Sequence, residues 1–194
     1  MMQNESLHRL QYTIWFISLI LAPLLLTVSQ FFWHNGLLSN TAGWLQVLAF
    51  TFWIPAFQAM FHLIKEKMPV YAILGFLVAI YACIGGNNFG VDGIYGEALQ
   101  INLVDAKNEL HQKFGIGGVI ALYIPGVLFP LSLLILGVNF LRTKSMNVWV
   151  ATILIIGAIG FPLSRIPREP IVAHLDNVLL LIAQGFIAFK YFKK

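Results

Sequence analysis

Charge is what this sequence most lacks: Asp, Glu, Lys and Arg together make up 10% of it, whereas 59% of its residues are hydrophobic. None of the four charged types occurs between Arg9 and Lys65, and uncharged windows also cover residues 68–91, 114–141 and 145–164. A helix needs about 20 mostly apolar residues to cross a hydrocarbon core of about 30 Å. The first window is long enough for two such spans, and each of the others holds one.

Several signatures of known chemistry are also missing. The single cysteine, Cys83, excludes an internal disulfide bond. The chain has no phosphate-binding G-x-x-x-x-G-K-[ST] loop, no dinucleotide-type glycine fingerprint, no C-x-x-C and no G-x-S-x-G. The sequence therefore predicts no cofactor and leaves open whether the protein is an enzyme.

The apolar windows predict an all-α, polytopic membrane protein with six transmembrane helices in a single domain, residues 1–194. Helices are expected because an isolated segment in lipid must satisfy its own backbone hydrogen bonds. Strands of a membrane barrel would alternate apolar and polar residues over about ten positions, and that pattern is absent. The expected spans are about 11–33, 43–64, 69–86, 117–141, 146–163 and 170–189.

Basic residues are divided unequally between the two sides of this arrangement. The side of the termini holds eight of the 12 Lys and Arg residues: Arg9, Lys65, Lys67, Arg142, Lys144, Lys190, Lys193 and Lys194. The positive-inside rule then predicts that both termini are cytoplasmic. Short connections and the lack of sorting signals favour a bacterial inner membrane. Because orientation accounts for the basic residues, the net charge of +4 does not indicate a nucleic-acid partner.

The connection between the third and fourth spans, residues 85–118, is the longest. Its glycines and asparagines in GGNNFGVDG, residues 85–93, are expected to end the third helix, since they permit turns with positive φ. Apolar residues then recur every three or four positions at Leu99, Leu103, Ala106, Leu110 and Phe114. This spacing predicts an amphipathic outer helix over about 95–114. It could simply join two spans, lie on the membrane surface or fold over the mouth of the bundle. Glycines at 115, 117 and 118 predict a flexible joint after it.

Polar side chains gather around the start of the last span, in RIPREPIVAHLDN, residues 165–177. Asp176 lies six residues after Pro170, hence about 9 Å along the helix at 1.5 Å per residue. An ionisable residue inside a span costs roughly 2.5 to 3.5 kcal/mol on insertion scales, so it marks a function or a structural pair. Arg165 and Arg168 are its expected partners. Two interpretations stay open: a salt bridge that fastens the last two spans together, and an acid that carries a proton or contacts a ligand.

The polar residues of the outer connections are expected to converge at one end of the bundle. His174 and Asp176 are the candidate catalytic residues. The candidate ligand-binding residues are Arg165, Arg168, Asn87, Asn88, His111 and Asn177. His174, Asn177 and Gln184 share one helical stripe, which is predicted to face other helices. A metal site of His34, His111 and His174 is geometrically allowed, but no close metal-binding spacing supports it and none is predicted.

Three functions remain open from the sequence. The favoured one is binding of a lipid or another amphiphilic small molecule in an extracytoplasmic pocket, with the arginines holding an anionic group and His174 or Asp176 moving a proton. The second is a small proton-linked transporter in which Asp176 titrates. The third is a non-catalytic subunit that docks a membrane-protein partner through its outer segment. Membrane lipids are expected partners in each case, and a homo-oligomer is left open.

Overall fold

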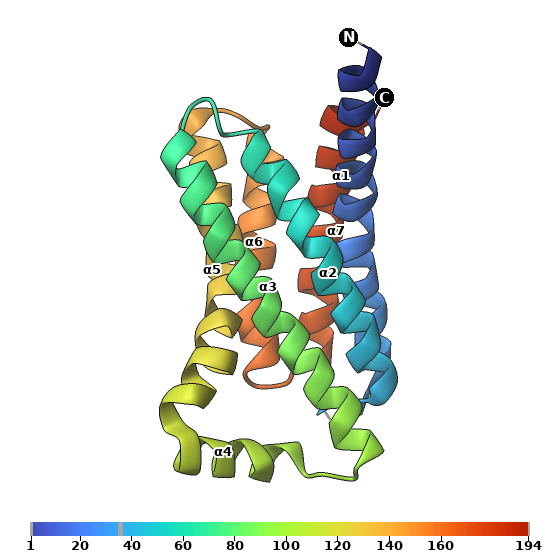
Figure 1. Cartoon of the computed structure of the whole chain (residues 1–194), viewed down its shortest axis with the longest axis vertical. Helices are drawn as coiled ribbons and strands as arrows, with labels where there is room; N and C mark the ends of the chain where they lie inside the picture. The colour runs from blue at the N-terminus through green and yellow to red at the C-terminus, as the bar shows by residue number, and fades with distance from the viewer. Residues whose placement is uncertain (1, 35–36, 194) are drawn as a thin grey trace.

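The computed structural model describes residues 2–34 and 37–193, except for the side chains of residues 2–4, 103, 104, 107, 111 and 114. The fold is all-α, and six of its helices are long and apolar enough to cross a membrane. They run alternately up and down, so both termini lie at the same end of the bundle (Figure 1). We call this end the terminal end, and the opposite end, which helix α4 crosses, the α4 end.

The membrane-spanning helices are α1 (Met2–Ser29), α2 (Asn40–His62), α3 (Pro69–Ala98), α5 (Ile124–Thr143), α6 (Val148–Arg165) and α7 (Pro170–Ile187). The remaining elements are η1 (Gln30–Phe32), β1 (Trp33–His34), β2 (Leu37–Leu38), α4 (Leu103–Gly118), and two π-helical segments, η2 (Val119–Tyr123) and η3 (Ala188–Phe192). The two short strands pair antiparallel, Trp33 with Leu38 and His34 with Leu37. Five of the six expected spans match these helices, with ends displaced by a few residues.

The ends of the helices follow from local chemistry. The Ser39 hydroxyl accepts a hydrogen bond from the Ala42 amide at 3.2 Å and so caps the first turn of α2. Pro69 and Pro170 begin α3 and α7, where a missing amide hydrogen costs nothing. Lys144 ends α5 in the left-handed conformation, with φ of 53°.

The expected end of the third span at residue 86 is wrong, because α3 continues unbroken to Ala98. Two of the glycines that suggested a break, Gly86 and Gly90, instead pack against α2, while Gly85 packs against Pro125 of α5 and Gly93 against Leu38 of β2. An added Cβ at Gly90 would lie 2.8 Å from the Gly43 carbonyl oxygen. The side-chain amide of Gln46 also donates a hydrogen bond to the Gly86 carbonyl at 3.0 Å. Small residues let two membrane helices approach closely. A break inside lipid would also have exposed backbone groups with no water to satisfy them.

The outer helix expected between the third and fourth spans is confirmed, but it covers Leu103–Gly118 rather than about 95–114. The chain reverses after α3 with Gln100 at a φ of 54°, and α4 begins at Leu103 after the Asn102 side chain accepts from the Asp105 amide at 3.4 Å. The expected glycine joint is helical, since α4 runs to Gly118 and continues directly into η2. Leu103 and Phe114, two members of the expected apolar stripe, lie outside the described side chains. In Figure 1, α4 lies across the end of the bundle rather than along it.

Aromatic rings form the centre of the core. The Phe129 ring of α5 lies 4.9 Å from Trp53 and 5.9 Å from Phe57 of α2, and 4.9 Å from Phe161 of α6, measured between centroids. Tilted and edge-to-face pairs of this kind add about 0.5 to 1.5 kcal/mol each beyond their buried area. Through Phe161 the aromatic core reaches the charged residues at the end of α6.

Candidate functional site

A buried ion pair joins α6 to α7 at the α4 end. One nitrogen of the Arg165 guanidinium lies 2.7 Å and 2.9 Å from the two carboxylate oxygens of Asp176, which is 2% exposed. The Ser164 hydroxyl donates to the same carboxylate at 2.5 Å. Both carboxylate oxygens are therefore occupied by donors from the last two residues of α6. Of the two interpretations of Asp176 drawn from the sequence, the structure contains the salt bridge that fastens the last two spans together.

The second arm of the guanidinium extends the pair into a network across three helices. It donates to the Asn177 side-chain oxygen at 2.9 Å, and the Asn177 amide group donates to the Leu26 carbonyl of α1 at 3.3 Å. Arg165 also lies over two rings, 4.1 Å from the Phe161 centroid and 5.7 Å from that of Trp33. An arginine placed over aromatic faces gains a cation–π attraction, while the planar guanidinium keeps its hydrogen bonds to Asp176 and Asn177.

Close backbone packing holds this network in place. A Cβ added at Gly160 of α6 would come within 2.8 Å of the Asp176 Cβ, so only glycine lets α7 lie this near. The charges of Arg165 and Asp176 cancel inside the bundle. The Asp176 carboxylate accepts hydrogen bonds from Ser164 and Arg165, and the guanidinium donates to Asp176 and Asn177. Binding an external anion to Arg165 would first require breaking a buried pair, at about 3 to 5 kcal/mol. The geometry therefore gives these residues a structural role.

Beside the network lies a buried group that sequence analysis did not single out. Gln30, one turn beyond Leu26, is 3% exposed, yet neither its amide nitrogen nor its amide oxygen hydrogen-bonds to a described residue. The indole nitrogen of Trp33 is buried without such a partner as well. Unpaired buried polar groups cost about 1 to 3 kcal/mol each unless water reaches them. No sequence periodicity marks Gln30, because it sits where α1 tightens into a 3-10 turn.

The other predicted site residues do not gather around Asp176. Arg168 is exposed with φ of 61° and forms no ion pair with a described residue. The His174 ring packs on Phe31, 4.5 Å between centroids, and His34 is exposed. The side chain of His111 lies outside the described set, so the structure does not test the three-histidine arrangement, which the sequence allowed but did not predict. Among the described residues, no three His, Cys, Asp or Glu side chains lie close enough to hold a metal ion.

Asn88 instead supports the π-helical segment η2. Its side-chain amide donates to the Ala121 carbonyl at 3.0 Å, and the Tyr81 hydroxyl, two turns earlier on α3, donates to the Ile120 carbonyl. A π-helical turn displaces carbonyls from their normal partners, and lipid offers no substitute. Asn87, the neighbouring candidate, keeps a buried side-chain oxygen with no hydrogen bond to a described residue.

A pocket of about 450 Å³ lies between α4 and η2. Asn108 and Gln112 line it from one face of α4, and Val119 and Tyr123 line it from one face of η2. Each pair is spaced by four residues, so its members lie on the same side of their helix. Sequence analysis missed this pocket, because the π-helical turn that shapes one wall has no sequence signature of its own.

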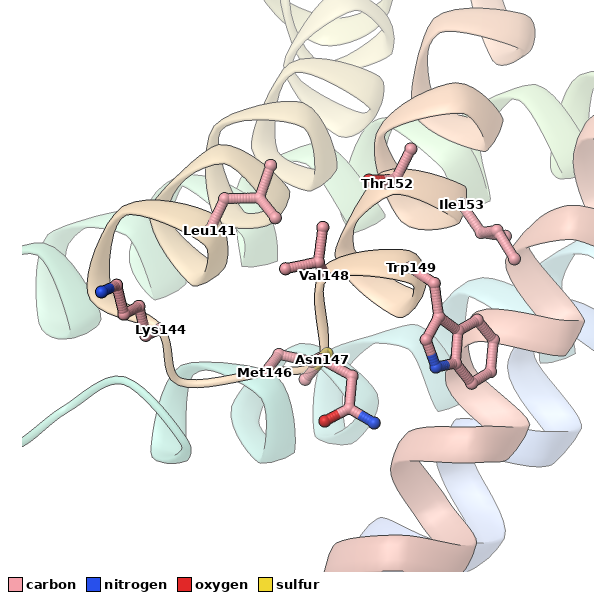
Figure 2. A pocket seen from close by; sticks show the side chains of 8 residues that line it. All are labelled: Leu141, Lys144, Met146, Asn147, Val148, Trp149, Thr152 and Ile153. Carbon is pink, nitrogen blue, oxygen red and sulfur yellow. The ribbon is translucent and has the colours of Figure 1, made fainter.

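A larger hollow of about 870 Å³ lies at the terminal end, where α5 turns into α6 (Figure 2). Leu141, Val148 and Ile153 give it mainly apolar walls, while Lys144 stands at the turn. The hollow opens outward between two spans, where acyl chains of the surrounding lipid fill such grooves in a membrane protein. The Asn147 side chain at its edge accepts a hydrogen bond from Lys190 of η3 at 3.0 Å.

No protein-family model, curated protein or solved structure matches this chain. Its pockets and the charges around them are therefore the features that bear on its function.

Proposed function

We propose that the protein binds a lipid or another amphiphilic small molecule in the pocket between α4 and η2. The observation that carries this proposal is the pocket of about 450 Å³ lined by Asn108, Gln112, Val119 and Tyr123. Small-molecule sites commonly measure about 300 to 1,000 Å³ and combine apolar walls with a few polar groups. This pocket has a volume in that range and lies open at the end of the bundle, with Val119 and the Tyr123 ring as its apolar part and two amides as its polar groups.

The surroundings of the pocket suit a molecule with a polar head and an apolar tail. The side-chain amides of Asn108 and Gln112 offer hydrogen bonds to a head group. Ile120 and Ile124 directly follow the pocket residues Val119 and Tyr123, and Ile116 lies one turn before Ile120. These isoleucines are 79% (Ile116), 51% (Ile120) and 41% (Ile124) exposed, so an acyl tail can run along them into lipid. The π-helical segment that forms one wall also supports the proposal, since such turns are often found at functional sites.

The lining residues favour an uncharged head group. None of the four carries a full charge at neutral pH, and Arg165, the cation expected to hold an anion, is committed to Asp176. Amide groups both donate and accept hydrogen bonds, which suits hydroxyl or amide heads. This replaces the anionic ligand expected from the sequence by a neutral one.

The test compares two double variants on the same helix. Asn108→Ala with Gln112→Ala removes the pocket amides, whereas Glu109→Ala with Lys113→Ala removes a neighbouring surface pair whose atoms lie 3.3 Å apart and which does not line the pocket. The probe is a monoacylglycerol, and binding to the protein in detergent micelles is measured by native mass spectrometry. Losing two hydrogen bonds of about 1 kcal/mol each should weaken binding about thirtyfold in the first variant.

The control variant should bind within about twofold of the unmodified protein. A fatty acid of the same chain length is the second probe, and a neutral-head site should bind it more weakly. Unchanged monoacylglycerol binding in the Asn108 and Gln112 variant would contradict the proposal. So would an equal loss in both double variants, which would indicate a general effect of α4 on the fold.

We propose further that the membrane is the bacterial inner membrane and that the terminal end faces the cytoplasm. The excess of Lys and Arg at the terminal end supports this orientation. Alkaline phosphatase, which is active only outside the cytoplasm, should be inactive when fused after the C-terminus and active when inserted after Gln100. The opposite pattern would reverse the orientation and place the pocket under α4 on the cytoplasmic side.

A further inference from the structure

A third pocket also lies at the terminal end, remote from α4 and separate from the hollow between α5 and α6. It measures about 630 Å³ and lies between the start of α1 and the turn from α2 to α3. From α1 it is lined by His8, Gln11 and Tyr12, whose spacing of three and four places them on one helical face. From the other side it is lined by His62, Leu63, Lys65, Glu66 and Lys67.

The lining groups are mostly hydrogen-bond donors and cations. Lys65 and Lys67 give two positive charges against the single negative charge of Glu66. His8 of α1 and His62 of α2 both line the pocket with them, so polar groups from both walls face the same space. Among the described residues, the two histidines and Glu66 do not form a metal-binding group. The chemistry of this pocket is therefore that of an anion site.

Aromatic packing fixes the floor of the pocket. The His62 ring lies 4.7 Å from the ring of Trp15, between centroids, and Trp15 donates its indole hydrogen to the Gln58 side chain at 3.0 Å. The Lys67 ammonium is anchored to the Thr143 carbonyl at the end of α5, which holds the turn against the bundle. Lys65 makes no hydrogen bond or ion pair with a described residue and is exposed, so its charge is available to a ligand.

We infer that this pocket binds a phosphate-bearing group. Phosphate oxygens accept several hydrogen bonds at once, and lysine is a common point-charge partner for them. The pocket lies where three spans leave the apolar core, which is the depth of lipid head groups. Both a phospholipid head and a small soluble phosphate compound carry this chemistry. The inference is independent of the pocket between α4 and η2, because the two lie at opposite ends of the bundle.

The experiment uses a matched pair of charge removals. Lys65→Gln removes a lining cation, while Arg9→Gln removes an equal charge from an exposed residue next to His8 that does not line the pocket. The full-length protein is placed in phosphatidylcholine nanodiscs that contain phosphatidic acid, and retained phosphatidic acid is counted by native mass spectrometry. In parallel, glycerol 3-phosphate and inorganic phosphate are titrated against the protein in micelles by calorimetry.

Lys65→Gln should weaken binding of at least one probe about tenfold, the ratio for losing one charge-assisted hydrogen bond of about 1.4 kcal/mol, and Lys65→Arg should restore it. Arg9→Gln should stay within about twofold. A loss confined to phosphatidic acid supports a lipid head group, and a loss seen with the soluble phosphates supports a free ligand. The inference is overturned if no probe binds, or if Lys65→Gln and Arg9→Gln weaken binding equally, because the effect would then come from the general positive charge of this end.

Discussion

Replacing Asp176 by asparagine should destabilise the protein strongly, because the substitution leaves the Arg165 guanidinium buried beside a neutral amide. The Arg165 side chain is only 19% exposed and Asp176 is 2% exposed. Removing one partner of a buried pair costs about 3 to 5 kcal/mol in water-soluble proteins. Polar contacts between membrane helices measure less, because the unfolded helices also find partners within the membrane. We therefore expect Asp176→Asn to cost about 2 to 3 kcal/mol.

A double-mutant cycle separates the pair from its surroundings. Arg165→Gln should cost more than Asp176→Asn, since it also loses the bond to Asn177 and the contact with Phe161. The variant with both changes has no unpaired charge, so its loss should fall short of the sum of the single losses by at least about 1.5 kcal/mol. Unfolding by dodecyl sulfate titration in mixed micelles, followed by tryptophan fluorescence, measures all four proteins. Additive losses, with a coupling below about 0.5 kcal/mol, would refute the role of the pair as a fastening between α6 and α7.

Three further expectations use the same unfolding assay. Gly160→Ala should cost at least about 1 kcal/mol by forcing α6 away from α7, whereas Gly185→Ala, whose added Cβ would meet nothing within 4 Å, should be neutral or stabilising by up to about 1 kcal/mol. Gly90→Ala should destabilise as Gly160→Ala does, because its Cβ would contact the α2 backbone; a neutral result would show that the two helices can separate without loss. Tyr81→Phe should cost about 1 kcal/mol and weaken monoacylglycerol binding, since it leaves the Ile120 carbonyl of the π-helical segment unsatisfied; unchanged values would mean that this bond does not support η2.

Glycine shows why one expected span was wrong while the others were right. Residues 85–93 resemble a turn when they are considered alone, because glycine and asparagine tolerate positive φ. In the bundle, Gly86 and Gly90 lie buried against α2, where Gly43 presents a matching small surface to Gly90. The sequence contains both halves of this contact, 47 positions apart. Their pairing depends on which helices become neighbours, and local propensity carries no information about that.

Asp176 shows how much of a site can be predicted. Its depth in the last span and the nearness of two arginines in sequence indicated an ion pair. Which arginine forms the pair depends on the geometry of the turn between α6 and α7: Arg165 ends α6 and points inward, while Arg168 is exposed on the turn itself. The bond from Asn177 to α1 crosses 151 positions of sequence. No pattern along the chain could have assigned it.

The pocket lined by Lys65 and the pocket between α4 and η2 differ in how far the sequence predicts them. The Lys and His residues of the terminal-end pocket belong to segments whose place at the membrane boundary follows from the hydropathy pattern alone, although their convergence does not. The pocket between α4 and η2 depends on a π-helical turn that is stabilised by Tyr81 and Asn88 of another helix. Pro125 has no amide hydrogen and so leaves the Ala121 carbonyl without its helical donor, whereas the α3 side chain that replaces this donor is chosen by tertiary contacts.

By itself, the sequence determined the number of spans, their helical nature and the side of the bundle on which the basic residues lie. These properties depend on the cost of placing charge and unsatisfied backbone groups in lipid, and that cost acts on each segment separately. Only the tertiary structure decided which polar residues form contacts between helices and which line a pocket. That division depends on contacts between distant segments: Arg165 and Asp176 satisfy each other, whereas Asn108 and Lys65 line pockets at the two ends of the bundle.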